Sequence, residues 1–196
     1  MTPRLRKFAF TAHVTFSVGW LGAVLAYLAL AIAGLTREDA QLVRAAYVSM
    51  ELIGWCVIVP CSLAALLSGL VQSLGTEWGL FRHYWIVVKF VLSLVGTLIL
   101  LVHMRAVSNM ARIAAETTLS RADYGMPRLQ LVVHAAGGLL VLLMATVLSV
   151  YKPWGKTRYG KSPAGVPKGL YVVLGIIALV LLVIVLHLTG HAPRGH

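Results

Sequence analysis

Four histidines lie inside or at the rims of long apolar segments of this chain: His13, His83, His103 and His134. Ionisable side chains are costly in lipid, so each of these histidines is a candidate functional residue. A neutral imidazole nitrogen is also a common ligand of haem iron and of transition metals. Several histidines that converge inside a helical bundle would therefore indicate a bound cofactor.

The apolar composition indicates an integral membrane protein. Of the 196 residues, 59% are hydrophobic and only 12% are charged, and several apolar runs are long enough to cross a bilayer. The net charge of +11 arises mostly from short loops between these runs, where the positive-inside rule and lipid headgroups account for it. We therefore expect the lipid bilayer as a partner and no nucleic acid, since no soluble basic domain is present.

Five apolar segments define the predicted fold class, an all-α membrane protein. A four-helix transmembrane bundle is followed by a fifth, C-terminal transmembrane helix, and residues 1–196 form a single integral membrane domain. The first segment is longer than the apolar core of a signal peptide, so we expect it to remain as an uncleaved helix. The predicted spans are about residues 8–34, 45–73, 84–101, 129–150 and 169–189.

The loops predict the orientation and the helix ends. With the N-terminus in the cytoplasm and the C-terminus outside, nine basic residues lie on the cytoplasmic side and seven on the other side. The loop 151–168 is rich in lysine, proline and glycine and is expected to be a linker on the membrane surface. Residues 104–119 contain good helix formers, so the third helix should continue beyond the bilayer. A break is expected at Tyr124, Gly125 and Pro127.

Depth in the membrane sorts the histidines into two pairs. His13 and His83 lie near the cytoplasmic face and form a possible inner pair, whereas His103 and His134 form a possible outer pair. His83 and His103 are 20 residues apart on one helix, which corresponds to a separation of roughly 30 Å and an angular offset of roughly 200°. Both cannot easily face one bundle core, so two equivalent sites are not expected.

Glycines favour the outer pair as the cofactor site. Lys89, Gly96 and His103 share a seven-residue spacing, so they lie on one stripe of the third helix, where the glycine allows close approach of a helix or a flat ligand. Gly137 and Gly138 follow His134 by three and four residues and predict a shallow surface beside its imidazole. Close helix packing is the equally weighted alternative for this glycine pair.

Other polar side chains in the spans have more than one interpretation. Glu51 in the second span could orient a ligating histidine or pair with Arg105, or it could be a protonated structural acid. Lys89 is expected to extend toward the cytoplasmic face, with a salt bridge to a haem propionate as the alternative. Cys56 and Cys61 point in different directions along one helix and are expected to be packing residues rather than a disulfide.

Three segments of the chain suggest a family. They read TAHVTFSVGWLGAVLAYLAL, GWCVIVPCSLAALLSGLVQSLGTEWGLFRHYWIVVKFVLSLVGTLILLVH and LVVHAAGGLLVLLMATVLSVYKPWG. They resemble a bacterial family of small predicted multi-pass integral membrane proteins of unknown function. The layout also loosely resembles CopD-type copper-resistance proteins and membrane b-type cytochromes, which implies a location in the bacterial cytoplasmic (inner) membrane. Unlike a cytochrome with two stacked haems, the chain has no histidine pairs 13 or 14 residues apart on each of two helices.

The leading functional prediction is a single haem b, bound by histidine axial ligands and used in electron transfer or in redox or gas sensing. His103 with His134 is the favoured ligand pair, and His13 with His83 is the alternative. The haem would be non-covalent because no C-x-x-C-H attachment motif is present. No catalytic motif is present either, so we expect an electron-transfer protein with a redox partner rather than a stand-alone enzyme.

Two further functions belong to other classes. Copper could be bound or transported by His103 and His134 with the thioethers of Met104 and Met50, because imidazole and soft sulfur suit this metal. Alternatively, the chain could be a non-catalytic membrane anchor or assembly subunit of a larger complex. In that case the histidines would form only interhelical hydrogen bonds. His187, His191 and His196 near the C-terminus are interpreted as tail residues.

Overall fold

The computed structural model describes residues 2–75, 80–116, 121–153 and 155–157. These residues are helical throughout their length apart from the connections and one isolated β-bridge between His83 and Lys156. The helices are α1 (Pro3–Thr36), α2 (Ala40–Ile53), a π-helical turn (Gly54–Ile58), α3 (Val59–Gly75), α4 (Tyr84–Glu116) and α5 (Arg121–Tyr151). Because α2, the π-helical turn and α3 run on without interruption, they form one rod from Ala40 to Gly75.

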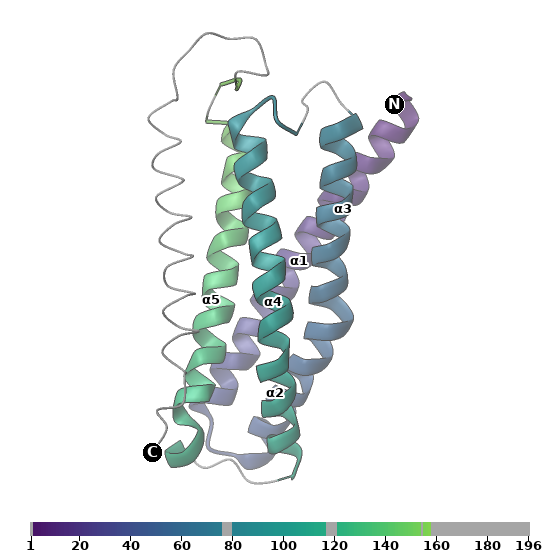
Figure 1. The fold of residues 1–196 in the computed structure, drawn as a ribbon. Helices are drawn as coiled ribbons and strands as arrows, with labels where there is room; N and C mark the ends of the chain where they lie inside the picture. The colour runs from purple at the N-terminus through teal and green to yellow at the C-terminus, as the bar shows by residue number, and fades with distance from the viewer. Residues whose placement is uncertain (1, 76–79, 117–120, 154, 158–196) are drawn as a thin grey trace.

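Four helical rods are long and apolar enough to cross a membrane, which confirms the first four predicted spans. They run alternately up and down, and the chain begins at the upper end of the bundle in Figure 1. We call this end, where α1 starts and α3 stops, the N-terminal end, and the opposite end the far end. The predicted fifth helix, at residues 169–189, and the three C-terminal histidines lie outside the described residues.

Helix packing places α1 and α4 opposite each other. Helix α1 packs against the α2–α3 rod and against α5, and α4 packs against the same two neighbours. The four rods therefore form a ring, with α1 and α4 facing each other across its centre. Side chains that extend from α1 toward α4 meet in the interior of the bundle.

Local sequence explains most helix ends. The side chain of Thr2 accepts a hydrogen bond from the backbone N–H of Leu5, and Pro3 occupies the first helical position of α1, where a missing N–H costs nothing. Asp39 caps α2 in the same way through the N–H of Leu42, at 2.8 Å. Helix α4 continues to Glu116, as the good helix formers after residue 104 predict.

The predicted break at Tyr124, Gly125 and Pro127 is wrong, because α5 runs through all three positions. A proline inside a helix removes one backbone hydrogen bond, and its ring crowds the carbonyl four residues earlier, so a helix through Pro127 needs a compensating contact. The next residue, Arg128, anchors this first part of α5 to α1, and that tertiary contact outweighs the local preference. After α5, the described residues of the 151–168 loop are non-helical and pair with residues 81–83 near the N-terminal end.

A π-helical turn interrupts the second rod just before Pro60. The N–H of Val59 donates to the carbonyl of Gly54, five residues earlier, instead of the usual four. A proline ring clashes with the carbonyl four residues before it, and the wider turn relieves this clash. The proline is thus accommodated without ending the rod.

The buried core is concentrated in the far half of the bundle. A stripe of α1 residues spaced three and four apart packs there against aromatic and methionine side chains of α2 and α4; it comprises Trp20, Val24, Tyr27, Ala31 and Gly34. Only a small second cluster, Val88, Leu92 and Leu148, lies toward the N-terminal end. The bundle is therefore tightly packed at one end and more open at the other.

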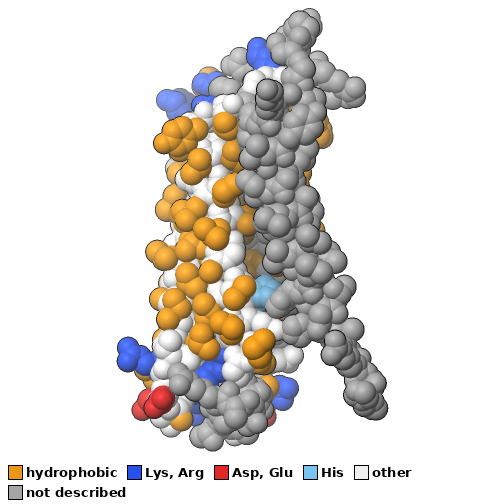
Figure 2. Space-filling view, turned by 90° about the vertical axis from the view of Figure 1, so that its left-hand side faces the viewer, with side chains coloured by type: hydrophobic (Ala, Val, Ile, Leu, Met, Phe, Trp, Pro, Cys, Tyr) orange, Lys and Arg blue, Asp and Glu red, His pale blue; other side chains and the backbone are white. Residues whose placement is uncertain are grey.

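The outward faces of the helices are apolar along most of their length. Leu67 and Val150, for example, are 65% and 69% exposed, although they are large hydrophobic residues. On the face shown in Figure 2, hydrophobic side chains cover the middle of the bundle, and Lys and Arg side chains gather at both ends. This distribution fits contact with a lipid bilayer, where the apolar surface faces acyl chains.

Candidate functional site

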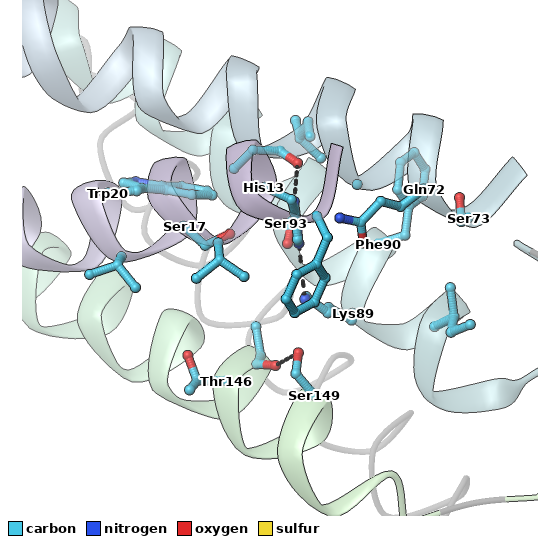
Figure 3. A pocket seen from close by; sticks show the side chains of 18 of the residues that line it. His13, Ser17, Trp20, Gln72, Ser73, Lys89, Phe90, Ser93, Thr146 and Ser149 are labelled. Atoms are coloured by element: carbon cyan, nitrogen blue, oxygen red, sulfur yellow. Dashed lines mark hydrogen bonds between the residues drawn. The ribbon is translucent and has the colours of Figure 1, made fainter. Parts of the chain in front are cut away.

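A cavity of about 830 Å³ opens in the N-terminal half of the bundle, between α1, α3, α4 and α5. We call it the N-terminal cavity. It lies where the buried core is thin, and Figure 3 shows side chains from the four helices around it. Its polar lining residues include His13, Ser17, Gln72, Ser73, Lys89, Ser93, Thr146 and Ser149. Its volume falls within the range of about 300–1,000 Å³ that is typical of small-molecule and cofactor sites.

The imidazole of His13 is held in one tautomer at this cavity. Its Nδ1 lies 3.0 Å from the carbonyl oxygen of Ala65 and 3.2 Å from the hydroxyl of Ser68. A carbonyl can only accept a hydrogen bond, so Nδ1 carries the hydrogen and Nε2 carries the lone pair. Metal-ligating histidines usually donate their second ring N–H to a carbonyl or carboxylate in this manner.

Gly69 provides the space in which the His13 ring lies. A Cβ atom built on this glycine would lie 3.0 Å from Cε1 of the imidazole. The ring therefore lies directly against α3, which supplies both its hydrogen-bond partners, Ala65 and Ser68, and the space beside Gly69. This confinement fixes the direction of Nε2.

Lys89 reaches across the centre of the bundle from α4. Its Nζ lies 3.3 Å from Nε2 of His13, so the amine donates to the imidazole lone pair (Figure 3). The expectation that Lys89 extends toward the membrane surface does not describe this structure, because His13 supplies an acceptor inside the cavity. The contact joins the two helices that face each other across the bundle.

Most hydroxyl groups of the cavity wall are satisfied by their own helices. The hydroxyls of Ser73, Thr146 and Ser149 donate to backbone carbonyls three or four residues earlier, at 2.8–2.9 Å. These hydroxyls make the wall polar without requiring a ligand. Of the described cavity residues, His13 and Lys89 thus form the hydrogen-bonded ionisable pair, and the cations Arg6, Lys7 and Lys152 also line the cavity.

The structure brings the outer pair together. The rings of His103 and His134 are stacked, with centroids 4.3 Å apart and planes inclined by 15°. Nδ1 of His134 donates to the carbonyl of Gln130 at 2.8 Å, which fixes its tautomer as well. The two rings lie face to face, whereas two axial ligands of one haem iron must point at it from opposite sides of the porphyrin.

The glycines near the outer pair have different surroundings from one another. Gly137 and Gly138 are exposed, and a Cβ atom on either would meet nothing within 4 Å. A Cβ atom on Gly96 would lie 3.9 Å from Val141, an ordinary contact between α4 and α5. Glu51 is partly exposed on α2, and among the described residues no hydrogen bond or ion pair joins it to His103, His134 or Arg105.

The inner pair is not brought together. The hydrogen bonds of His13 run to α3 and α4, whereas His83 lies in the connection before α4, paired with Lys156 and 6.4 Å from the ring of Trp85. Cys56 and Cys61 are both free thiols; Cys61 is half-buried, whereas Cys56 is exposed, so the expectation that both are packing residues does not hold for Cys56. In the described part of the chain, no three side chains of His, Cys, Asp or Glu form a group that could hold a metal ion.

The thioethers in the copper hypothesis belong to the packed core. Met104 and Met50 are both fully buried. The sulfur of Met104 lies against Gly54, only 2.7 Å from where a Cβ atom on that glycine would be. The side chain of Met104 thus fills the space between the second rod and α4.

Sequence reasoning missed a buried arginine at the far end. Arg128 precedes the predicted span 129–150, which suggests a loop cation, but it is 2% exposed, and its Nε donates to the carbonyl of Gly34 at 3.0 Å and to the Tyr47 hydroxyl at 3.1 Å. Its Nη2 also donates to Gly34. The cation thereby satisfies a carbonyl in the last turn of α1, where the helix dipole favours positive charge.

A seven-residue spacing in the sequence of α1 marks the positions of this helix that face the interior of the bundle. His13, Trp20, Tyr27 and Gly34 follow one another at this interval, which places them on one stripe of the helix. The stripe faces the cavity at His13 and Trp20 and the packed core at Tyr27 and Gly34.

No family model, curated protein or solved structure matches the chain. The resemblances to small bacterial membrane proteins, CopD-type proteins and b-type cytochromes therefore stay predictions from the sequence. The residues of the site are the basis for assigning a function.

Proposed function

We propose that the protein binds one haem b non-covalently in the N-terminal cavity, with Nε2 of His13 as an axial ligand. The protein would act in electron transfer or in redox or gas sensing, in the bacterial inner membrane with its N-terminus in the cytoplasm. The observation that carries this proposal is the pairing of a fixed imidazole tautomer with a cavity of cofactor size.

The cavity supports this proposal better than the outer pair does. His103 and His134 stack face to face beside the densely packed half of the bundle, which suits interhelical packing. His13 instead directs a lone-pair nitrogen into the cavity, where it accepts a hydrogen bond from Lys89, and apolar walls are contributed by residues such as Phe10, Val14 and Phe90. An apolar pocket with a few oriented polar groups is the usual form of a cofactor site.

Several residues of the chain would hold the cofactor, each with a different role. When bound, haem supplies reversible one-electron chemistry, or small-molecule binding if one axial position stays open. The Ala65 carbonyl orients His13, and the apolar wall keeps water from the site. As a haem ligand, Nε2 would no longer accept the hydrogen bond from Lys89, and the amine would then be able to pair with a propionate.

The visible spectrum of the purified protein tests the proposal. After expression with sufficient haem, we expect a Soret band and one haem per chain. Absence of the band, together with absence of stoichiometric metal, would favour a membrane anchor or assembly subunit. Stoichiometric copper without haem would instead favour the copper-binding function.

Gly69→Val is expected to weaken haem binding about tenfold, the lower end of the usual cost of disturbing an outer-shell partner of a metal ligand. The valine side chain would enter the space of the His13 ring, since even its Cβ would lie 3.0 Å from Cε1. The measurement is a haem titration in lipid nanodiscs.

Gly22→Val is the matched control for this substitution. A Cβ atom on Gly22 meets nothing within 4 Å, so the same change should leave haem affinity unaltered. An equal loss of haem affinity in Gly69→Val and Gly22→Val would contradict the positioning role of Gly69.

A further inference from the structure

We propose that Arg6 and Lys7 form an anion-binding mouth of the N-terminal cavity, which holds the carboxylates of an amphiphilic ligand while its apolar body lies deeper in the bundle. For haem, this assigns the propionates to the N-terminal end. The inference rests on the proposed function for haem itself, and the mouth is also tested below with a ligand that contains no iron.

The position of the two cations within the cavity is the first argument. Arg6 and Lys7 lie in the first turns of α1 and line the same cavity as His13, six or seven residues further along that helix. Six to seven residues of α-helix span about 10 Å. A ligand could therefore contact the cations and the imidazole at the same time.

Among the side chains that the structure describes, charge is distributed unequally between the two ends of the bundle. The acidic side chains that the structure describes, Glu38, Asp39, Glu51 and Glu116, belong to the α1–α2 connection, to α2 and to the end of α4, all in the far half. Cationic side chains prevail at the N-terminal end of the described chain. A cleft with one sign of charge and low-dielectric walls concentrates ligands of the opposite sign.

The cavity is lined by cations at its mouth and by apolar side chains further in, which is the order that an amphiphilic ligand requires. Beyond the cationic mouth, the wall contains Phe10, Val14 and Val18 on α1 and Phe90 on α4. Deeper still, Trp20 and Leu21 line the cavity where it meets the packed core. An anionic group at the mouth and an apolar body at the deep end match this order.

Two double variants test the mouth. Each removes two positive charges from the N-terminal end of the protein, and they differ only in whether those cations line the cavity. Arg6→Gln with Lys7→Gln removes the cations of the mouth. Arg4→Gln with Lys156→Gln removes two exposed cations that do not line the cavity. In nanodiscs of zwitterionic lipid, we expect the first double variant to raise the Kd for haem about 5- to 10-fold and the second to change it less than twofold.

Ester ligands test the mouth independently of the iron site, because esterification removes the carboxylate charge and leaves the rest of the ligand in place. Haem dimethyl ester should bind the wild-type protein about 5- to 10-fold more weakly than haem, and this preference should become smaller in the Arg6/Lys7 double variant, where Lys89 and Lys152 still line the cavity. Nitroxide-labelled stearate and its methyl ester provide an iron-free comparison, read by electron paramagnetic resonance, with the same expected preference for the free acid.

Equal weakening by the two double variants, or equal affinity for acid and ester, would overturn the anion-binding mouth. If haem binds and depends on His13 but shows no preference over its ester, only the mouth fails. If haem does not bind while stearate is still preferred over its ester in a manner dependent on Arg6 and Lys7, the haem function fails and the mouth stands.

Discussion

Gly34→Ala is expected to destabilise the protein by about 1–3 kcal/mol, the usual cost of overpacking a tight core. A Cβ atom at this position would lie 2.7 Å from Cζ and 2.9 Å from the hydroxyl of Tyr47. The tyrosine cannot easily move, because it is fully buried and Arg128 binds both its hydroxyl and the Gly34 carbonyl. At roughly 2–4 °C per kcal/mol for a chain of this size, Tm should fall by about 2–12 °C in nanodiscs.

Gly22→Ala provides the matched control on the same helix. A methyl group at this position meets no atom within 4 Å, and alanine favours a helix over glycine by about 1 kcal/mol. We therefore expect an unchanged or slightly raised Tm. An equal fall in Tm for Gly22→Ala and Gly34→Ala would show that the close contact with Tyr47 is not the cause.

A double substitution identifies the contact itself. Tyr47→Leu destabilises the protein on its own, because Arg128 loses a hydrogen-bond acceptor. It also removes the ring atoms that the new methyl group would meet. Gly34→Ala combined with Tyr47→Leu should therefore be less destabilising than the sum of the two single changes, by about 1 kcal/mol.

The placement of the first four long helices could be predicted because membrane insertion depends on local composition. Twenty apolar residues in a row have few alternatives to a transmembrane helix, and the first four predicted spans match the four rods. The helix through Pro127 could not be predicted locally. Its stability depends on Arg128, whose acceptors on Gly34 and Tyr47 lie more than 80 residues away in the sequence.

The site was predicted in part. Depth alone brought His103 and His134 together correctly, but it could not reveal that their rings would stack face to face. The similar depth of His13 and His83 in the membrane suggested that these two residues are neighbours. In the structure, His13 instead faces Lys89 on α4, because depth does not determine which side of its helix a residue lies on. Helix rotation is set by tertiary packing, in this case by the space that Gly69 leaves on α3.

The cavity had no local signal in the sequence. It exists because large core side chains gather in the far half of the bundle, while α1 and α4 stay apart near the N-terminal end. The serines and threonines of its wall hydrogen-bond to their own helices, so their spacing is the same as that of ordinary polar residues in a helix. The seven-residue spacings from His13 to Gly34 and from Lys89 to His103 mark helix faces, but they do not reveal an empty volume between the helices.

His13→Ala is expected to abolish haem binding, whereas His134→Ala should retain it. Loss of an outer-shell partner alone costs about 10- to 100-fold in metal affinity, so loss of the ligating nitrogen should cost more. His134 stacks on His103 and donates to the Gln130 carbonyl, so its replacement is expected to affect packing between α4 and α5 rather than haem. The measurement is the Soret band per chain after haem titration in nanodiscs, with Tm recorded for each variant.

Rescue separates ligation by His13 from a structural role. In His13→Gly, added imidazole can enter the vacated space beside Gly69 and supply the missing ring nitrogen, so we expect it to restore the Soret band. A merely structural histidine would not show this concentration-dependent recovery at unchanged Tm. If His134→Ala instead removes the haem and His13→Ala keeps it, the outer pair ligates the iron, and the stacked arrangement of His103 and His134 must open to admit it.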